Sequence, residues 1–422
     1  MTSHPSSAEW QRRAAAVTPL GSQTLSKTSS QWVQGPAPGF LVSGRGSHVC
    51  DVDGNEYVDW PMALGPVLLG HAHPGVNEAI RRQLDLGITF TLPHPLEVQV
   101  AERVVAMCPG VEAVRFVKTG SDATSAAVRV ARARTGRDLV LVGGYHGWHD
   151  WYIGSTTRDA GVPKAVSDLT IAFRADDLDH LDALLERHRG EVAAVVLEPS
   201  GAHVPEPGDL QRLVESCRSH GAISVFDEVI TGFRVAPGGA RERYEVQPDL
   251  SCYGKALGNG MPVAAVAGTW EVMRGFEEVF VSGTHGGETL SLAAARAVLD
   301  AIATGGPLAH IERLGRRLRD GLGTIVQTRA VQDRVRVGGE PARAVVTFPD
   351  DPGLIARSWV QQCFLEDGQL FNGSMFVCAE HSDADVDGAL ATFDRALQAI
   401  EAGEDLRSKL TGPPVSPVFR EP

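Results

Sequence analysis

The feature that most constrains the fold of this chain is an alternation, between about residues 70 and 300, of short apolar runs with stretches of helical periodicity. AVRFVKTG (113–120) predicts a strand that leaves into a glycine turn. Strands that alternate with helices form a mostly parallel sheet covered on both faces, so we predict an α/β fold. Four further runs predict buried strands of that sheet: DLVLVGG (138–144), VAAVVLEP (192–199), AISVFDEV (222–229) and PVAAVAGT (262–269).

The regions on either side of this alternation predict a smaller second domain. Residues 1–46 are polar and rich in Ser, Pro and Gly, which favours an arm. HVCDVDGNEYVDW (48–60) predicts two short strands around an Asp-Gly turn. Towards the C-terminus, helical segments mix with two strand candidates at 342–349 and 369–378. The predicted organisation is an N-terminal arm that forms part of the small domain (1–69), a large domain (70–305) and a C-terminal small domain (306–422).

Composition excludes several classes of protein. The formal charge of −13 argues against nucleic-acid binding, which requires clustered Lys and Arg. The sequence has no apolar run of 18 residues, so we expect no membrane span. The N-terminal stretch MTSHPSSAEWQRRAAAV lacks the apolar core of a signal peptide and favours a cytoplasmic chain. The six cysteines include no C-x-x-C pair, which favours free thiols in a reducing compartment over a disulfide framework or a zinc site.

The ends of the predicted strands carry the residues that could bind a ligand or take part in a reaction. SDATSAAVRVARARTG (121–136) predicts a helix with Ser121 as its N-cap and Gly136 at its end. Because ligands of parallel α/β sheets bind beyond the carboxyl ends of strands, we expect these ends to converge on one side of the sheet. Four strand ends qualify: the Gly120-Ser121-Asp122 turn, Glu198, Asp227-Glu228 and the loop that carries Lys255.

Taken one at a time, these features admit ordinary explanations. The turn at 120–122 offers backbone N–H groups and a helix N-terminus to a phosphate, but it is equally a good helix start. Asp227 either faces water or is compensated by a cation or by hydrogen bonds. We expect no metal, because the histidine pairs lack the i, i+4 spacing of a zinc helix. Those pairs are His71 with His73, and His146 with His149.

Lys255 favours a shared function for these features. It is the only basic residue between Arg243 and Arg274, and it lies among small residues. The loop YHGWHDWY (145–152) is dense in flat side chains and either plugs the core or stacks on an aromatic ring. A lysine amine for a Schiff base, an acid for a ring nitrogen, a ring to stack and a turn for a phosphate are the contributions that pyridoxal phosphate chemistry needs. Small neighbours of the lysine leave space for that cofactor.

The chain resembles the class III aminotransferases, which are pyridoxal phosphate enzymes of fold type I. The resemblance is carried by SVFDEVITGFR (224–234) and by PDLSCYGKALGNGMPVAAVAG (248–268), whose Gly-Lys lies 28 positions beyond the Asp. It extends through DVDGNEYVDW, GHAHPGV, TGSDAT, YHGWHDW, LEP and GTHGGETLSLAAA. Within the class, the chain is most similar to the glutamate-1-semialdehyde aminomutase group and its sugar and natural-product aminotransferase relatives. The fold implied is a mostly parallel, seven-stranded-type sheet in a large domain, with a smaller α+β domain from both termini.

The resemblance also implies roles for individual residues. Lys255 would form the Schiff base with the cofactor and move the substrate proton, and Asp227 would pair with the pyridinium nitrogen. Val229 and Tyr145 would pack on the two faces of the ring. The remaining cofactor contacts implied are Gly120, Ser121, Asp122, His146, Glu198 and, in a homodimer, Thr284 of the partner subunit.

Two departures from the aminomutase pattern bear on the substrate. The segment TLSKTSSQW (24–32) has Ser and Thr where that group carries an arginine for a carboxylate, and NGS (372–374) replaces a glutamate. We therefore predict transfer of an amino group from an amino acid, such as glutamate, to a neutral or hydroxyl-rich aldehyde or ketone of sugar, aminocyclitol or nucleoside type. The alternatives are the aminomutase itself and a pyridoxal phosphate decarboxylase or epimerase. Predicted substrate contacts are Trp32, Trp60, Trp148, Glu198 and Asn372.

Overall fold

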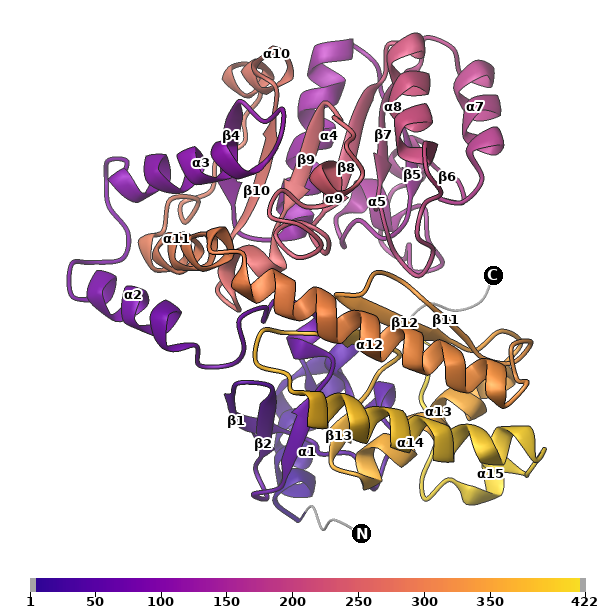
Figure 1. Ribbon diagram of the computed structural model, residues 1–422. Coiled ribbons are helices and arrows are strands. Elements are labelled where there is room, and N and C mark those ends of the chain that lie inside the picture. Colours follow the sequence, from indigo (N-terminus) through magenta and orange to yellow (C-terminus); the bar gives the residue numbers. More distant parts are fainter. Residues whose placement is uncertain (1–4, 418–422) are drawn as a thin grey trace. The chain divides into compact units, whose positions relative to one another are not determined.

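The computed structural model describes residues 5–417, which fall into two compact units (Figure 1). One unit combines the described chain up to His73 with the described chain from Ala309 onward. The other unit is continuous and runs from Pro74 to Leu308. All four strand ends that the sequence singled out belong to the continuous unit.

The continuous unit is built on a seven-stranded sheet, as the α/β prediction requires. Its strands, in spatial order, are β4 (Ala113–Val117), β10 (Ala264–Gly268), β9 (Leu250–Tyr253), β8 (Ile223–Glu228), β7 (Val192–Leu197), β5 (Leu139–Gly143) and β6 (Thr170–Ala172). β10 pairs antiparallel with both β4 and β9, whereas the remaining pairings are parallel. The mostly parallel sheet is therefore confirmed, but the strand predicted at 262–269 runs against the others.

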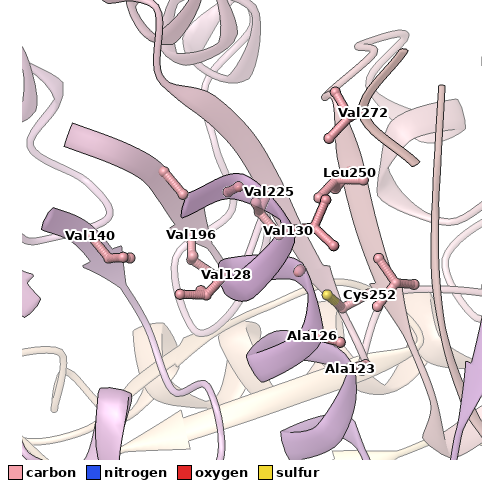
Figure 2. Packing of buried hydrophobic residues seen from close by; sticks show 14 of the residues in the cluster. Ala123, Ala126, Val128, Val130, Val140, Val196, Val225, Leu250, Cys252 and Val272 are labelled. Atoms are coloured by element: carbon pink, nitrogen blue, oxygen red, sulfur yellow. The ribbon is translucent and has the colours of Figure 1, made fainter. Parts of the chain in front are cut away.

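Helices cover both faces of this sheet because its strands are apolar on both sides. Val140 and Val142 of β5 pack in one cluster with α4, while Leu139 and Leu141 pack in a second cluster with α7 and α8. Figure 2 shows the first cluster, in which Ala126 of α4 lies towards the strands. Each fully buried Val or Leu stabilises the fold by about 1.5–3 kcal/mol. The two clusters fix the sheet as a rigid platform whose strand ends carry the polar residues.

Most helices of the continuous unit lie between its strands in the sequence, whereas α2 and α3 precede the first strand. The helices are α2 (Pro74–Leu84), α3 (Pro95–Met107), α4 (Gly120–Thr135), α5 (Asp150–Ile153), α6 (Lys164–Ser167), α7 (Leu178–Arg187), α8 (Asp209–His220), α9 (Ala240–Arg243), α10 (Trp270–Met273) and α11 (Thr289–Ala303), with the short 3₁₀ helices η5 (Lys255–Gly258) and η6 (Arg274–Glu277). Gly136 ends α4 with a left-handed φ of 66°, as predicted. The predicted N-cap was wrong, because Thr119 caps α4 and Ser121 lies inside its first turn.

The discontinuous unit holds two small sheets. β1 (Leu41–Arg45), β2 (His48–Asp51), β3 (Glu56–Asp59) and β13 (Gln369–Leu370) form one, and β11 (Arg336–Gly338), β12 (Arg343–Thr347) and β14 (Ser374–Phe376) form the other. β2 and β3 pair antiparallel, which confirms the hairpin predicted at 48–60. Its helices are α1 (Pro5–Val17), α12 (Gly306–Thr328), which starts just before the division, α13 (Ile355–Glu366), α14 (Asp383–Glu401) and α15 (Leu406–Lys409), with 3₁₀ turns η1 (Pro19–Gly21), η2 (Leu25–Lys27), η3 (Ser29–Gln31), η4 (Met62–Leu64) and η7 (Pro352–Leu354).

Two features of this unit differ from the prediction. The N-terminal arm carries a helix (α1) and a strand (β1) that its polar composition did not reveal. The candidate strand at 369–378 is two short strands in different sheets, because Gly373 adopts a φ of 95° between them.

In the described part of the chain, no single helix has the length and apolar composition needed to cross a membrane. Among the described residues, the helices α11 and α12 have that length and apolar composition only when the two are taken together.

Candidate active site

The four strand ends lie along one edge of the sheet, because β4, β7, β8 and β9 point the same way. Asp227 of β8 is the register partner of Cys252 on β9, and Lys255 follows three residues after that cysteine. On the other side of β8, Leu197 pairs with Phe226, so Glu198 begins beyond the neighbouring strand end. The structure thus confirms that these strand ends share one edge.

Asp227 is a buried carboxylate, with 5% of its surface exposed. Its Oδ2 lies 2.9 Å from Nδ1 of His146, and its Oδ1 accepts a hydrogen bond from the Val229 N–H at 3.2 Å. Because a carboxylate only accepts, the Nδ1 atom of His146 carries the hydrogen in this pair. The His146 ring is itself buried between Trp151 and Tyr152, and its Nε2 has no hydrogen-bond partner among the described residues. The pair therefore places an oriented acid at the end of β8.

Lys255 occupies an unusual backbone position. Its φ of 39° is left-handed, a conformation that costs a residue with a side chain about 1 kcal/mol or more. Such strain persists where the surrounding structure imposes it, and it is concentrated at functional sites. The preceding Gly254 is extended, and a Cβ there would make an ordinary van der Waals contact with Val229, at 3.4 Å. The turn after β9 thus fixes the half-buried side chain of Lys255 at the strand edge.

The turn between β4 and α4 is closed by a capping box. The Thr119 hydroxyl accepts from the Asp122 N–H at 3.1 Å, and the Asp122 carboxylate accepts from the Thr119 N–H at 2.8 Å. Gly120 lies against Val229, because a Cβ on it would be 3.0 Å from both γ-carbons of that valine. The first N–H groups of a helix lack intrahelical acceptors, so Gly120 and Ser121 offer donors to an anion at this turn. The N–H and the carboxylate of Asp122 are both used by this cap, and its part in binding a phosphate stays a prediction.

The aromatic loop follows β5 and is held against α4. Its backbone passes Ser121 so closely at Gly147, where φ is 102°, that a Cβ would lie 2.3 Å from the serine hydroxyl oxygen. The Trp148 N–H donates to that same oxygen at 3.3 Å. Only glycine fits at this crossing. The phosphate-type turn and the aromatic loop are therefore a single packed assembly.

Two hydroxyls that the sequence prediction missed complete this assembly. Thr124 donates to the carbonyl of His146 at 2.9 Å, and Ser125 lies 2.6 Å from Nδ1 of His149. Ser125 also accepts from the indole N–H of Trp151 at 2.9 Å. Together with Ser121, they occupy the i, i+3 and i+4 positions of one helix face, a pattern that the sequence SDATS contained.

Tyr145 and Glu198 meet at the same edge. The Tyr145 N–H donates to Oε2 of Glu198 at 3.0 Å, and the Tyr145 side chain is 50% exposed. Burial of its hydroxyl end raises the pKa of Tyr145, and the nearby charges of Asp227 and Glu198 raise it further. The ring therefore stays neutral and presents an aromatic surface beside two carboxylates.

Glu228 differs from its neighbour Asp227 and serves the structure. It is fully buried and accepts from the N–H groups of Ala240 at 2.5 Å and Arg241 at 3.2 Å, at the start of α9. The Thr231 hydroxyl donates to it at 3.2 Å. Burial raises the pKa of Glu228 to about 7. Of the two acids in the motif, Asp227 alone faces the aromatic loop.

Thr284 lies in an exposed, glycine-rich loop between η6 and α11. The loop borders a cavity of about 1110 Å³, which Lys118, Asp122 and Trp270 also line. Lys255, Asp227 and Tyr145 do not line this cavity. Within one chain, Thr284 therefore belongs to a different surface from the lysine and the acid.

The predicted substrate contacts other than Glu198 have separate environments. Trp60 is fully buried, donates to Gln369 at 2.9 Å and stacks on His381, so its prediction as a substrate contact is wrong and it belongs to the core. Trp32 is half-buried. Asn372 is also half-buried, and its side-chain oxygen accepts from the Ser374 N–H at 3.1 Å. Trp148, in the aromatic loop, is 67% exposed.

The histidines weighed as metal ligands have other partners. His71 lies 2.8 Å from Asp59, and His146 and His149 bond as described above. Among residues 5–417, no group of three or more His, Cys, Asp or Glu side chains is arranged to hold a metal ion.

The family that the sequence resembles is supported by comparison, because the aminotransferase class-III family model matches residues 30–344 of the chain. The chain belongs to that family. Glutamate-1-semialdehyde 2,1-aminomutase of Syntrophobacter fumaroxidans is 40% identical over 306 residues, which cover 68% of this chain and 71% of that protein.

Solved structures agree with this membership. The PLP internal aldimine form of the FumI protein of Sphingopyxis sp. MTA144 matches with a TM-score of 0.88 at 29% identity, covering 97% of this chain and 98% of that one. An omega-transaminase of Sphaerobacter thermophilus matches with a TM-score of 0.84 at 28% identity, covering 95% and 98%. The expected family and the fold type I architecture are confirmed, and the expected cofactor is the one that the FumI structure is described as holding.

Proposed function

We propose that this chain is a pyridoxal 5′-phosphate-dependent aminotransferase that moves an amino group from an amino acid to an aldehyde or ketone. The observation that carries the proposal is Lys255, held in a left-handed turn at the strand edge where the buried Asp227–His146 pair also ends. When bound, the cofactor supplies an electron sink for the carbanion that forms at the substrate carbon. The residues present fit this group.

Each residue has a task that its surroundings support. Lys255 would hold the cofactor covalently, and its amine would accept and return the substrate proton. Asp227 holds the ring-nitrogen proton, and His146 orients that carboxylate through the 2.9 Å contact. Tyr145 and Val229 would pack against the cofactor ring. The N–H groups of the turn at Gly120 bind the phosphate, because this turn has donors and no side chain in the way.

For the acceptor, we propose a neutral, hydroxyl-rich aldehyde or ketone, with an amino acid such as glutamate as donor. Residues 24–32 contain Lys27 and no arginine. A bidentate arginine contributes roughly 1.5–3 kcal/mol to binding of a carboxylate, so its absence disfavours a small anionic substrate by about tenfold or more. The remaining predicted acceptor contacts are Trp32, Trp148, Glu198 and Asn372.

A second candidate is glutamate-1-semialdehyde 2,1-aminomutase, which the name of the similar protein from Syntrophobacter favours. Lys27 is exposed and is the one cation of residues 24–32, so it is the group that would replace the arginine in this case. Decarboxylation or epimerisation uses the same lysine and acid, and analysis of the products separates those reactions from transamination.

We also propose that the active form is a homodimer in which Thr284 of the partner subunit completes the phosphate site. Two features support this. Thr284 is exposed at the rim of the 1110 Å³ cavity. In addition, alternate residues from the last residue of α2 onward expose large apolar side chains, which monomeric surfaces rarely gather. These are Leu84, Leu86, Ile88, Phe90 and Leu92.

The test compares kcat/KM for glutamate-1-semialdehyde with that for oxidised sugar and aminocyclitol acceptors, with glutamate as donor. We expect the hydroxyl-rich acceptors to react more efficiently and the semialdehyde to require an added donor. Formation of 5-aminolevulinate from the semialdehyde alone would establish the mutase instead. Lys27→Met is the matched variant: it should lower semialdehyde conversion about tenfold if Lys27 binds the carboxylate, and should leave neutral acceptors unchanged.

A further inference from the structure

The N-terminus of α11 is a junction built on Glu288. The carboxylate caps the helix by accepting from the Leu290 N–H at 2.5 Å, and it accepts from the Ser291 hydroxyl at 2.5 Å. It also pairs with the Lys118 ammonium at 3.0 Å, and only 21% of the lysine side chain and 13% of the glutamate side chain are exposed. Burial acts to raise the pKa of Glu288, but the hydrogen bonds from Ser291 and Lys118 outweigh it and the pKa is lowered. The pair is therefore ionised and largely shielded from water.

This ion pair connects two segments that the proposed function assigns to different phosphates. Lys118 lies between β4 and Thr119, the residue that opens the turn for the chain's own cofactor. Glu288 ends the loop that carries Thr284, which we propose serves the cofactor of the partner. One salt bridge thus ties a subunit's own phosphate turn to the loop that it lends to its neighbour.

The loop is held firmly at its other contacts as well. The Phe280 carbonyl accepts from Arg129 at 2.7 Å, and the Val281 carbonyl accepts from Arg115 at 2.8 Å. Near its end, Gly287 passes so close to Glu97 that a Cβ would lie 2.6 Å from the carboxylate oxygen. Thr284 is therefore exposed on a loop that is held near both ends, and Glu288 is the last residue of that loop.

We propose that the Lys118–Glu288 pair is a positioning element that sets cofactor affinity in both sites of the dimer: in its own subunit through the turn at Thr119, and in the partner through Thr284. The inference rests on the proposed function, namely on cofactor binding by a homodimer. A helix N-cap needs only an oxygen acceptor, which a neutral side chain supplies. Capping alone therefore does not require the shielded charge of Glu288 and its partner Lys118. The proposed link between the two cofactor sites gives this charged pair a purpose.

Glu288→Gln tests the charge alone, because glutamine keeps the side-chain length and an oxygen to cap α11. We expect the dissociation constant of pyridoxal phosphate, measured by quenching of protein fluorescence, to rise about fivefold to tenfold, the effect of losing a shielded ion pair. Lys118→Met should raise the dissociation constant similarly. The double variant should bind the cofactor no more weakly than either single variant, because both substitutions remove the same interaction. Asp300→Asn is the control: it removes the exposed ion pair between Asp300 of α11 and Arg103 of α3, and it should leave the dissociation constant unchanged.

Hybrid dimers distinguish the two routes. One subunit carries Lys255→Ala, so that only the other subunit yields the imine absorbance on titration with the cofactor; a hybrid with no further change gives the baseline. Adding Glu288→Gln to the Lys255→Ala subunit reports the route through Thr284, and adding it to the intact subunit reports the route through Thr119.

We expect weaker binding than the baseline in both hybrids. Baseline affinity in either hybrid overturns the proposed double role. A parent protein that forms no imine contradicts the proposed function itself, and a monomeric parent contradicts both proposals.

Discussion

Replacing Asp227 with asparagine should leave the protein folded and remove most of its activity. Asparagine has the same shape, and its carbonyl oxygen can still accept from the Val229 N–H, which lies 3.2 Å from Oδ1 in the parent. The amide NH₂ would then face Nδ1 of His146, 2.9 Å away in the parent, and the imidazole can accept there by shifting its hydrogen to Nε2. We therefore expect a thermal midpoint close to that of the parent.

The loss of activity follows from the charge. Asp227 is only 5% exposed, so water screens it little. At an effective dielectric constant of about 20, a unit charge about 4 Å from another contributes roughly 4 kcal/mol, and sharing the carboxylate with His146 reduces this to roughly 2–4 kcal/mol. Each 1.36 kcal/mol changes a rate about tenfold, so Asp227→Asn should slow the chemistry about 30-fold to 1000-fold.

The assay is the rate of the first half-reaction, in which the amino acid donor converts the cofactor, followed by absorbance at saturating cofactor. A cofactor analogue with a methylated ring nitrogen carries the positive charge permanently, so it should restore part of the rate in the variant and add nothing in the parent. A variant rate within fivefold of the parent rate would refute the assignment of Asp227 as the acid for the ring nitrogen.

Two further predictions test the assembly around the site. Gly147→Ala should raise the dissociation constant of the cofactor at least tenfold, because the methyl group would lie 2.3 Å from the Ser121 oxygen; Ser121→Gly in the same chain should recover part of the loss, and unchanged binding in Gly147→Ala would contradict the packing described. Burial raises the pKa of Glu228 from its ordinary 4.5 to about 7, so the stability that its neutral form provides is lost as the pH climbs through that interval. The glutamine side chain of Glu228→Gln cannot ionise. The thermal midpoint of this variant, relative to that of the parent, should therefore rise between about pH 5 and about pH 8; a difference between the two midpoints that stays constant with pH would contradict this.

Much of the sheet could be predicted because its strands are continuous apolar runs. β7 and β8 lie within the predicted ranges 192–199 and 222–229. The direction of β10 could also have been predicted. Ten residues separate Tyr253 of β9 from Ala264 of β10, and a parallel crossover needs about a dozen or more. The composition of the strand indicated its burial, whereas the length of the connection determined its direction.

The site was predicted less evenly. Lys255 and Asp227 follow from strand ends, since the edge on which such residues meet is a property of parallel sheets. The cap of α4 was misplaced by two residues, although Thr119 and Asp122 have the spacing of a capping box. The contact of Thr124 with the His146 carbonyl and the burial of Trp60 depend on how separate segments pack, and a local pattern does not contain that information.

The central claim is that Lys255 binds pyridoxal phosphate covalently, and borohydride reduction of the cofactor-loaded protein tests it most directly. Reduction should abolish the imine absorbance and fix the cofactor on the peptide that contains Lys255, and Lys255→Ala should bind the cofactor without covalent attachment. Label on any other lysine, or none after reduction of a protein that binds the cofactor, would contradict the account.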